Sequence, residues 1–351
     1  MTKYIARRLF QLLPTFIGAT LLAFLIIQLT PGDFTDRFAL DPNADATQLQ
    51  RLRENFGLDQ PIIVQYGRWM WGILTQGYLG ESFTYRSPVT AIILPLIANS
   101  LSLVVVSLIL TYALAIPIGV YSAIRQYSTS DKVVSFLSIM GLAIPNFFFI
   151  LLLIVGVLLL QSGLKAAGAS GAWYVPVLDF FSYNLRDGLL FPVGGMRTSE
   201  TFESLSWFGQ IGDRLWHLVL PTIVVTTSGL SSLVRVVRGQ MLEFLQADFV
   251  RTARAKGLHG RTVVYKHALK NAIGPVISGL GTILPELVTG AGLVEFVYRW
   301  PGITPAFVSA ITQRDLYVVM GLLFLSAVML MIGNLLSDLL LATVDPRIRY
   351  T

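Results

Sequence analysis

The side chains that could do chemistry in this chain are concentrated in residues 248–277, DFVRTARAKGLHGRTVVYKHALKNAIGPVI. Their chemistry is mainly that of positive charge, with two histidines, His259 and His267, among the arginines and lysines. A basic surface of this kind could dock a cytoplasmic protein or contact anionic lipid headgroups. Charge alone does not separate these two roles, so the elements that position the residues must be considered.

Catalytic and cofactor-binding motifs are absent from the sequence. None of the six lysines follows a glycine, which excludes the Gly-Lys step of a P-loop and therefore that route to ATP binding. The histidines lack HExxH spacing, no G-x-S-x-G elbow occurs, and there is no cysteine to act as nucleophile or metal ligand. The sequence therefore predicts neither an enzyme nor a metal site.

Composition identifies the chain as an all-α integral membrane protein. Hydrophobic residues make up 54% of the 351 positions and only 13% are charged, whereas soluble domains carry about 25% charged residues. A membrane-spanning helix needs about 20 mostly apolar residues, and windows free of charge, or broken only by Glu286, meet this requirement in six places. The predicted spans are residues 9–29, 99–124, 133–160, 215–238, 273–297 and 317–342.

Lysines and arginines set the expected orientation, because short loops rich in them stay cytoplasmic. With the N-terminus inside, 15 of the 26 basic residues but only five of the 20 acidic ones lie on the cytoplasmic side. Both termini are therefore expected in the cytoplasm, and membrane orientation explains the net charge of +6. The segments 30–98 and 161–214 are expected to be extracytoplasmic, 239–272 to form a cytoplasmic loop, and residues 1–351 to make one domain.

Glu286 is an ionisable residue expected at membrane depth, where such a group is a functional hypothesis by default. It follows Pro285, whose missing N–H would free a carbonyl where a broken helix could line a cavity. A single glutamate hydrogen-bonded inside the bundle explains it equally well. The alternative function, an ion-coupled secondary transporter, would normally show paired intramembrane carboxylates or an inverted repeat with broken helices.

The spacing within 248–270 predicts a short amphipathic helix, a turn and a second helix. On a helix with steps of about 100°, one flank is small and apolar and another is basic. These flanks are Phe249, Ala253 and Gly257, and Arg251, Arg254 and Arg261. Gly257 suits a left-handed helix C-terminus, and Thr262 could cap the next helix. We call residues 248–270 the elbow.

Several motifs resemble the membrane-spanning permease subunits of ATP-binding-cassette importers, specifically the first-subunit type of the peptide and nickel uptake group. They are RRLFQLLPTFIGAT, GLDQPIIVQYGRW, GYLGESF, RTARAKG, HALKNA, EFVYRWPGI, RDLYVV and NLLSDLLLATVDPRIRY. Together they cover nearly all of the chain except 161–214. The elbow resembles the family's EAA loop, and Ala253, Gly257 and Leu269 match the general pattern of that loop.

This resemblance implies a type I importer permease fold of six helices in a prokaryotic plasma (inner) membrane. The implied partners are a second homologous permease subunit, two ATPase subunits that use ATP and Mg, an extracytoplasmic solute-binding protein and the bilayer, but no nucleic acid. The residues expected to couple to an ATPase are Phe249, Arg251, Thr252, Ala253, Arg254, Gly257, Leu258 and Leu269.

The resemblance also indicates where a solute would pass, in the fourth and fifth spans. The pathway candidates are Thr226, Thr227, Ser228, Ser231, Ser232, Glu286 and Thr289. Hydroxyls at membrane depth also simply bond neighbouring helices, which is the alternative for this set. A structural role is expected for the turn that contains Glu295, Pro301 and Gly302. The solute stays open among dipeptides, oligopeptides, nickel chelates, opines and oligosaccharides.

Overall fold

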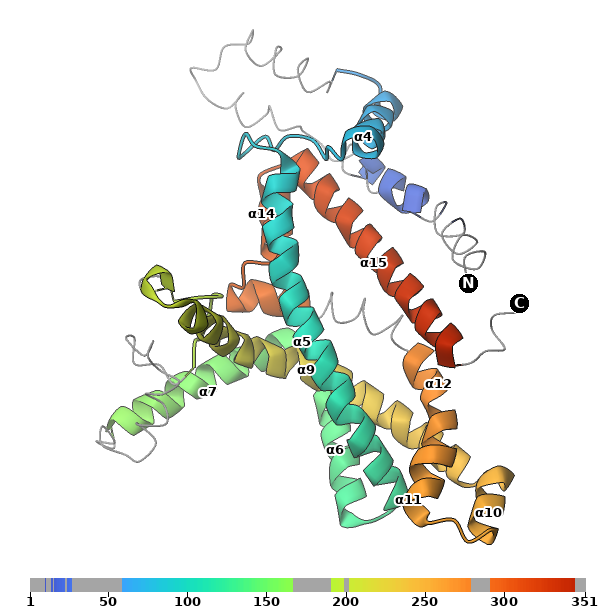
Figure 1. Ribbon diagram of the computed structural model, residues 1–351. Helices are drawn as coiled ribbons and strands as arrows, with labels where there is room; N and C mark the ends of the chain where they lie inside the picture. The colour runs from blue at the N-terminus through green and yellow to red at the C-terminus, as the bar shows by residue number, and fades with distance from the viewer. Residues whose placement is uncertain are drawn as a thin grey trace. The chain divides into compact units, whose positions relative to one another are not determined.

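The computed structural model consists of helices joined by turns in the part of the chain that it describes (Figure 1). The described residues are 10, 14, 16–22, 24–26, 59–166, 191–198, 202–278 and 291–344. Contacts divide the chain into two compact units, Met1–Ala98 with Gly302–Leu335, and Asn99–Pro301 with Leu336–Thr351. The prediction of a mostly helical protein is confirmed.

In the first unit, Trp69 fixes one short helix against the last helix of the chain. Its indole Nε1 donates to the carbonyl oxygen of Leu79 at 3.0 Å, and its ring packs edge-on against Phe324. Burying a large aromatic ring with its N–H satisfied gives both packing energy and a fixed orientation. The helical elements of this unit include α4 (Ile62–Gln76), the start of α5 (Val89–Ile124), α14 (Ile303–Thr312) and α15 (Leu316–Val344) up to Leu335.

The opposite face of α4 is apolar and exposed. Ile63, Trp71 and Leu74 are all more than two-thirds exposed, and their spacing places them on one side of the helix. The helix ends at Gly77, whose left-handed backbone has φ 63° and whose N–H bonds the carbonyls of the last turn. An apolar face of this kind on a short helix suits the surface of a bilayer.

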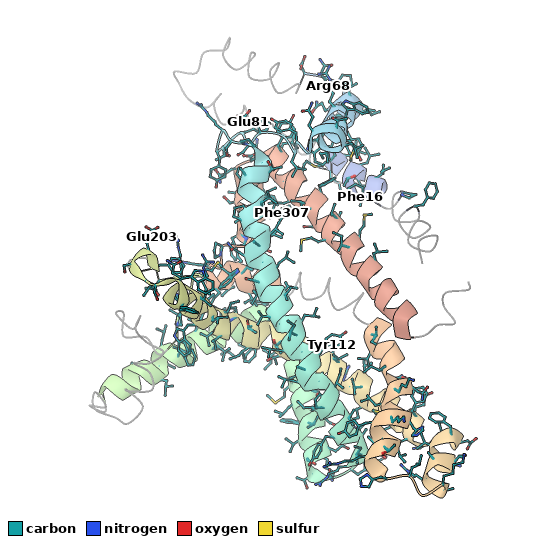
Figure 2. All side chains as sticks on the ribbon, in the orientation of Figure 1. Phe16, Arg68, Glu81, Tyr112, Glu203 and Phe307 are labelled. Atoms are coloured by element: carbon teal, nitrogen blue, oxygen red, sulfur yellow. The ribbon has the colours of Figure 1, made fainter. Side chains whose placement is uncertain are left out.

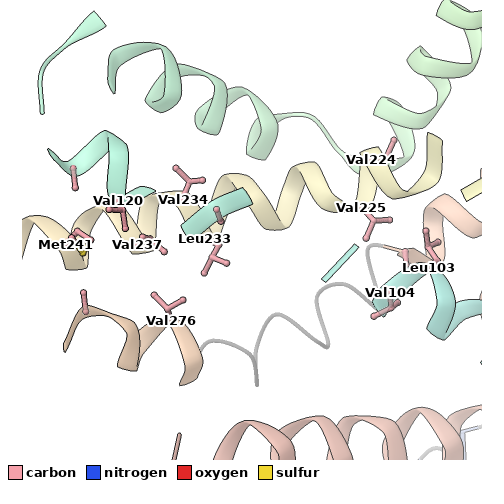
Figure 3. Packing of buried hydrophobic residues seen from close by; sticks show 14 of the residues in the cluster. Leu103, Val104, Val120, Val224, Val225, Leu233, Val234, Val237, Met241 and Val276 are labelled. Atoms are coloured by element: carbon pink, nitrogen blue, oxygen red, sulfur yellow. The ribbon is translucent and has the colours of Figure 1, made fainter. Parts of the chain in front are cut away.

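The second unit is organised around α9, the longest helix that the structure describes. Valines and leucines of α9 pack against α5, and the close-up in Figure 3 shows Leu233, Val234 and Val237 in this cluster. The remaining elements of this unit include α6 (Thr129–Ala143), α7 (Asn146–Ala166), η2 (Phe202–Ser204), α9 (Trp207–Leu245), α10 (Asp248–Ala255), α11 (Gly260–Thr262), η3 (Val263–Leu269) and α12 (Lys270–Ser278).

Close packing between α5 and α9 depends on Gly119. A Cβ at this position would lie 2.7 Å from Val237 Cβ and 3.1 Å from the carbonyl oxygen of Val234. Both neighbours are difficult to move, because one is a β-branched side chain and the other is backbone. The glycine therefore sets how closely these two helices approach.

Gly119→Ala is expected to destabilise the protein by about 1–3 kcal/mol, because it overpacks this contact. The matched control is Gly156→Ala on α7, where an added Cβ meets nothing within 4 Å. The control should leave stability unchanged or raise it, since alanine favours the helix. Thermal unfolding in detergent measures both variants, and equal midpoints for the two would contradict the packing described above.

Charge counting predicts a single span over 133–160, but the structure divides this range into α6 and α7. The two helices are bent by 103° at a short break. Pro145 explains the break, because its ring disfavours helical backbone at the preceding residue, and Ile144 is extended with φ −90° and ψ 117°. The range forms one broken span or a re-entrant pair.

Three described helices are long and apolar enough to cross a membrane, α5, α9 and α15 up to Leu335, or four if the bent pair is one span. Two of them extend beyond the predicted spans. Helix α5 begins at Val89 instead of residue 99, and α9 covers Trp207–Leu245 instead of 215–238. Both extensions reach past the apolar window, because a helix can continue beyond the hydrocarbon core.

The other two predicted spans are described only in part. A short apolar helix covers Phe16–Ile26 within 9–29, and residues 279–290 of the predicted span 273–297 lie outside the described residues. The predicted extracytoplasmic segments 30–98 and 161–214 are likewise described only from residue 59 and over 191–198 and 202–214, together with the end of α7. The six-span topology therefore stays a prediction.

Candidate functional site

The predicted elbow is present as the short helix α10, a turn, and the continuous helical run of α11, η3 and α12. Helix α10 covers Asp248–Ala255 and ends in the way that its glycine predicts. Gly257 is left-handed with φ +74°, its N–H donates to the Arg254 carbonyl at 2.9 Å, and the Leu258 N–H donates to the Ala253 carbonyl at 3.3 Å. The predicted left-handed C-terminus at Gly257 is confirmed.

One face of α10 is buried within the chain. Val250 is completely buried and Ala253 is 5% exposed, and both belong to the core cluster that includes Met241 of α9 and Val263 of η3. Burying a valine side chain contributes about 1.5–3 kcal/mol. The buried pair is thus Val250 and Ala253, whereas the sequence predicts a flank of Phe249, Ala253 and Gly257.

The other face of α10 is exposed, and it combines positive charge with two apolar side chains. Phe249 and Leu258 are 42% and 41% exposed, and the Phe249 ring also approaches Phe244 with centroids 6.3 Å apart. Arg251 lies 3.8 Å from Asp248, but both side chains face solvent, so this ion pair contributes little to stability. The remaining exposed elbow residues include Thr252, Arg254, Lys256, Gly257, His259 and Arg261.

The turn between α10 and α11 is capped by His259. Its imidazole Nδ1 accepts a hydrogen bond from the Arg261 N–H at 3.3 Å. Thr262, which the sequence predicts as the cap, instead has helical backbone and makes no side-chain cap. The prediction was wrong because the second helix begins at Gly260, two residues before the threonine.

After the turn, Val263–Leu269 forms a π-helix, a rare conformation that occurs frequently at functional sites. Val263 and Ala268 are buried on it, and Leu269 packs partly buried against the same core cluster. Nothing in the sequence pattern predicts the change of helical pitch. The π-helix joins the elbow directly to α12, so the elbow is continuous with the helix that follows it.

A buried ion pair that sequence reasoning missed lies between the α5–α6 turn and α9. Arg238 donates to both carboxylate oxygens of Asp131, from Nε at 2.7 Å and from a terminal nitrogen at 2.9 Å. Asp131 also accepts from the Ser122 hydroxyl and, at 2.8 Å, from the Tyr127 N–H. The pair lies toward the same end of α9 as α10 and α11 (Figure 1), and it cross-links three helices there.

The pathway candidates on α9 mostly contact neighbouring helices. Thr226 is buried, and its hydroxyl donates to the Ser107 carbonyl of α5 at 3.4 Å. Thr227 donates to its own helix, at the Ile223 carbonyl 2.7 Å away. Ser228 accepts a hydrogen bond from the Asn146 amide nitrogen of α7 at 3.4 Å. These contacts match the alternative that hydroxyls at membrane depth bond neighbouring helices.

Ser231 packs at the contact of α9 with α6. A Cβ added to Gly141 would lie 2.1 Å from the Ser231 hydroxyl oxygen and 3.2 Å from a methyl group of Thr227, so both side chains fill the space that this glycine leaves. Ser232 is half-buried. Glu286 and Thr289 lie outside the described residues.

The turn at residues 295–302 is held firmly by buried groups. Glu295 is 2% exposed and accepts a hydrogen bond from the Ser100 hydroxyl of α5. The Trp300 ring is fully buried, with its Nε1 donating to the Asn99 carbonyl at 3.1 Å, and the Asn99 amide donates to the Pro301 carbonyl at 2.8 Å. These contacts agree with the structural role expected for Glu295 and Pro301, while Gly302 is the residue that precedes α14.

Two further buried carboxylates hold loops in the same manner, and the sequence gave no sign of either. Asp315 accepts from the Ser82 hydroxyl at 2.6 Å and from the Thr84 N–H at 3.0 Å. Asp213 accepts from the hydroxyl and the N–H of Thr198, at 2.7 and 3.0 Å. In both cases the partner is remote in the sequence or lies across a loop, which a helical or charge-spacing pattern cannot reveal.

Long apolar helices and a basic elbow packed against the central helix define a multi-pass membrane protein with a docking surface between two helices. The comparisons with known proteins agree with this class. The family described as binding-protein-dependent transport system inner membrane component matches residues 115–350, and the model of its N-terminal part matches residues 1–104. The chain belongs to this family and is a non-catalytic permease subunit of an ATP-binding-cassette importer.

Similar proteins match from end to end. The oligopeptide transport system permease protein AppB of Bacillus subtilis is 38% identical over 351 residues, which cover 100% of both chains. The dipeptide transport system permease protein DppB of Escherichia coli K12 is 35% identical over 353 residues, with 100% and 99% covered. The di/tripeptide permease protein DppB of Pseudomonas aeruginosa is 37% identical over 354 residues. The family match includes 161–214, which the sequence motifs did not cover.

Proposed function

We propose that this chain forms half of the translocation pathway of a peptide importer. The observation that carries the proposal is its end-to-end similarity to three permeases whose names specify oligopeptides, dipeptides and di- or tripeptides. The other half is a second homologous permease subunit. Two ATPase subunits that use ATP and Mg, and an extracytoplasmic solute-binding protein, complete the complex in a prokaryotic plasma membrane.

The proposed topology has six spans with both termini in the cytoplasm. Segments 30–98 and 161–214 face the outside, and the elbow lies inside within the 239–272 loop. The charge distribution supports this orientation, because the elbow and the chain ends hold most of the basic residues. The exposed apolar face of α4 then lies at the outer surface of the bilayer, where its tryptophan suits the interface.

The elbow is the proposed contact with an ATPase subunit. Its exposed face presents Phe249 and Leu258 as apolar contacts among arginines, and apolar anchors with surrounding polar groups are typical of protein interfaces. Arginine at such a position favours a protein partner, because aromatic and arginine side chains are enriched at interfaces. Ala253 would act indirectly, since its small buried side chain sets how closely α10 packs on the chain.

Motion of the elbow would reach the membrane helices through buried contacts. Val250 and Ala253 pack α10 on the core cluster that contains α9, and η3 continues without interruption into α12. Closure of the ATPase subunits on ATP would thereby tilt α9 and α12 together as a rigid body. Alternating access would follow as a two-state equilibrium that the nucleotide biases.

Reconstitution tests the proposed function. The chain, its companion permease subunit, the two ATPase subunits and the binding protein are placed in proteoliposomes, and uptake of labelled di- and oligopeptides is measured. Uptake is expected to require ATP and the binding protein, and to exceed the ATP-free level at least tenfold. The isolated chain should be inert, and uptake by it down an imposed proton or sodium gradient would favour an ion-coupled transporter instead.

A further inference from the structure

Helices α5 and α9 run side by side in the second unit and carry hydroxyl groups toward each other. Close contact at Gly119 with Val237, and the hydrogen bond from Thr226 to the Ser107 carbonyl, fix their alignment at two levels. Ser107 and Thr111 lie one turn apart on α5, and Thr222 and Thr226 lie one turn apart on α9. We call these four residues the hydroxyl seam.

Three hydroxyls of the seam are buried and have no hydrogen-bond partner in the described part of the chain. Ser107 and Thr111 are 0% exposed, Thr222 is 5% exposed, and the hydroxyl oxygen of each is unpaired. Buried polar groups in proteins are usually satisfied, so each unpaired one requires an explanation. Three at one contact between two helices indicate a shared cause.

Serine and threonine in a helix have a simple way to avoid this cost, which is to donate to the carbonyl four residues earlier. This chain uses it elsewhere: Ser138 donates to Val134 at 2.8 Å, Thr227 to Ile223 at 2.7 Å, and Ser326 to Leu322 at 2.8 Å. The seam hydroxyls do not, although they occupy ordinary helix. Their orientation into the contact is therefore a property of the seam and not of helical hydroxyls in general.

Burial within a single chain decides how these hydroxyls could ever find a partner. The oxygen atoms are covered by the chain itself, so a second permease subunit or a solute could reach them only after α5 and α9 separate. Both helices contain a proline near the seam, Pro117 on α5 and Pro221 on α9. Proline removes a backbone hydrogen bond from the helix, which makes bending easier at that level.

We propose that the hydroxyl seam is a polar section of the translocation pathway that opens during the transport cycle. This inference rests on the proposed function. In the open state Ser107, Thr111 and Thr222 bond a passing solute that carries amide N–H and C=O groups. Hydroxyls suit such a solute because each can donate and accept, without selecting among side chains. Closing the seam removes these bonds and returns the hydroxyls to the buried, unpaired state.

Thiol labelling tests whether the seam opens, and the chain is well suited to it because it contains no cysteine. Ser107→Cys and Thr111→Cys are placed singly in the complete reconstituted complex and exposed to N-ethylmaleimide. Labelling of this chain is expected to be at least tenfold faster with ATP, binding protein and peptide than without ATP. The matched control is Val120→Cys on the same helix, which is 1% exposed and apolar, and its slow labelling should not change.

Removing the hydroxyls tests whether they matter for transport. The double variant Ser107→Ala/Thr111→Val deletes two unpaired buried hydroxyls, so its thermal midpoint should be unchanged or raised. Its ATP-dependent peptide uptake should nevertheless fall at least fivefold. The control Ser138→Ala removes a buried hydroxyl that already bonds its own helix, and its uptake should stay within twofold of the parent.

The outcomes separate the two proposals. If the parent complex takes up peptide but both cysteines label as slowly as Val120→Cys in every state, the seam does not open and the inference is wrong. Parental uptake by the double variant would also overturn it, because the hydroxyls would then serve no solute. Absence of uptake by the parent complex would contradict the proposed function itself, and the inference would fall with it.

Discussion

Replacing Gly257 with leucine is expected to lower ATP-dependent peptide uptake at least tenfold while the chain still inserts in the membrane. The residue has φ +74°, and a residue with a Cβ loses about 1–2 kcal/mol in this conformation. Space is not the constraint, because a Cβ there would meet nothing within 4 Å. The backbone would relax toward negative φ and re-aim Leu258 and the turn that follows, which spoils the surface offered to the ATPase subunit.

Two variants separate backbone strain from added bulk. Gly257→Ala keeps the strain with almost no extra surface, so it should already reduce uptake. Gly260→Leu adds the same bulk in the same turn, but Gly260 begins α11 and is not among the glycines with positive φ. We expect Gly260→Leu to retain more uptake than Gly257→Leu. Full uptake and undiminished ATPase association by Gly257→Leu would contradict the role assigned to the elbow.

Breaking the Asp131–Arg238 pair is expected to destabilise the protein unequally from its two sides. The Asp131 side chain is 4% exposed, whereas that of Arg238 is 25% exposed. Arg238→Gln leaves a buried carboxylate without its cation and should cost about 3–5 kcal/mol. Asp131→Asn leaves a guanidinium that can partly reach water, so its cost should be smaller.

A double-mutant cycle on thermal unfolding in detergent measures the coupling between the two residues. The double variant Asp131→Asn/Arg238→Gln should recover part of the loss caused by Arg238→Gln alone, because it buries no unpaired charge. Equal costs for the two single variants, or strictly additive costs in the double, would show that the pair does not hold the α5–α6 turn to α9. The elbow would then have one fewer rigid connection to the helices.

The helical character of the chain and the shape of the elbow could be predicted because each depends on neighbours in the sequence. Apolar runs determine long helices, and a glycine after α10 determines its left-handed end. The division at Pro145 was also written in the sequence. Counting charges overlooked it, because that method measures only the length of an apolar window and not whether its backbone can continue.

The ion pair and the buried carboxylates could not be predicted, because their partners are set by tertiary packing. Asp131 and Arg238 are separated by 107 positions, and Ser82 and Asp315 by 233. The buried face of α10 was misassigned for the same reason, since the side that Val250 occupies depends on where α9 and η3 lie. A hydrophobic pattern over one short helix of eight residues leaves that choice open.

Cross-linking from the elbow tests the central claim most directly. Phe249→Cys or Leu258→Cys carries a short photo-reactive label in the assembled complex, and Leu159→Cys on α7, an exposed apolar position outside the elbow, serves as the control. Both elbow positions are expected to cross-link to an ATPase subunit, with a yield that changes when ATP is added, while the control does not. Cross-links from the elbow to lipid alone, in a complex that transports peptide, would contradict the account.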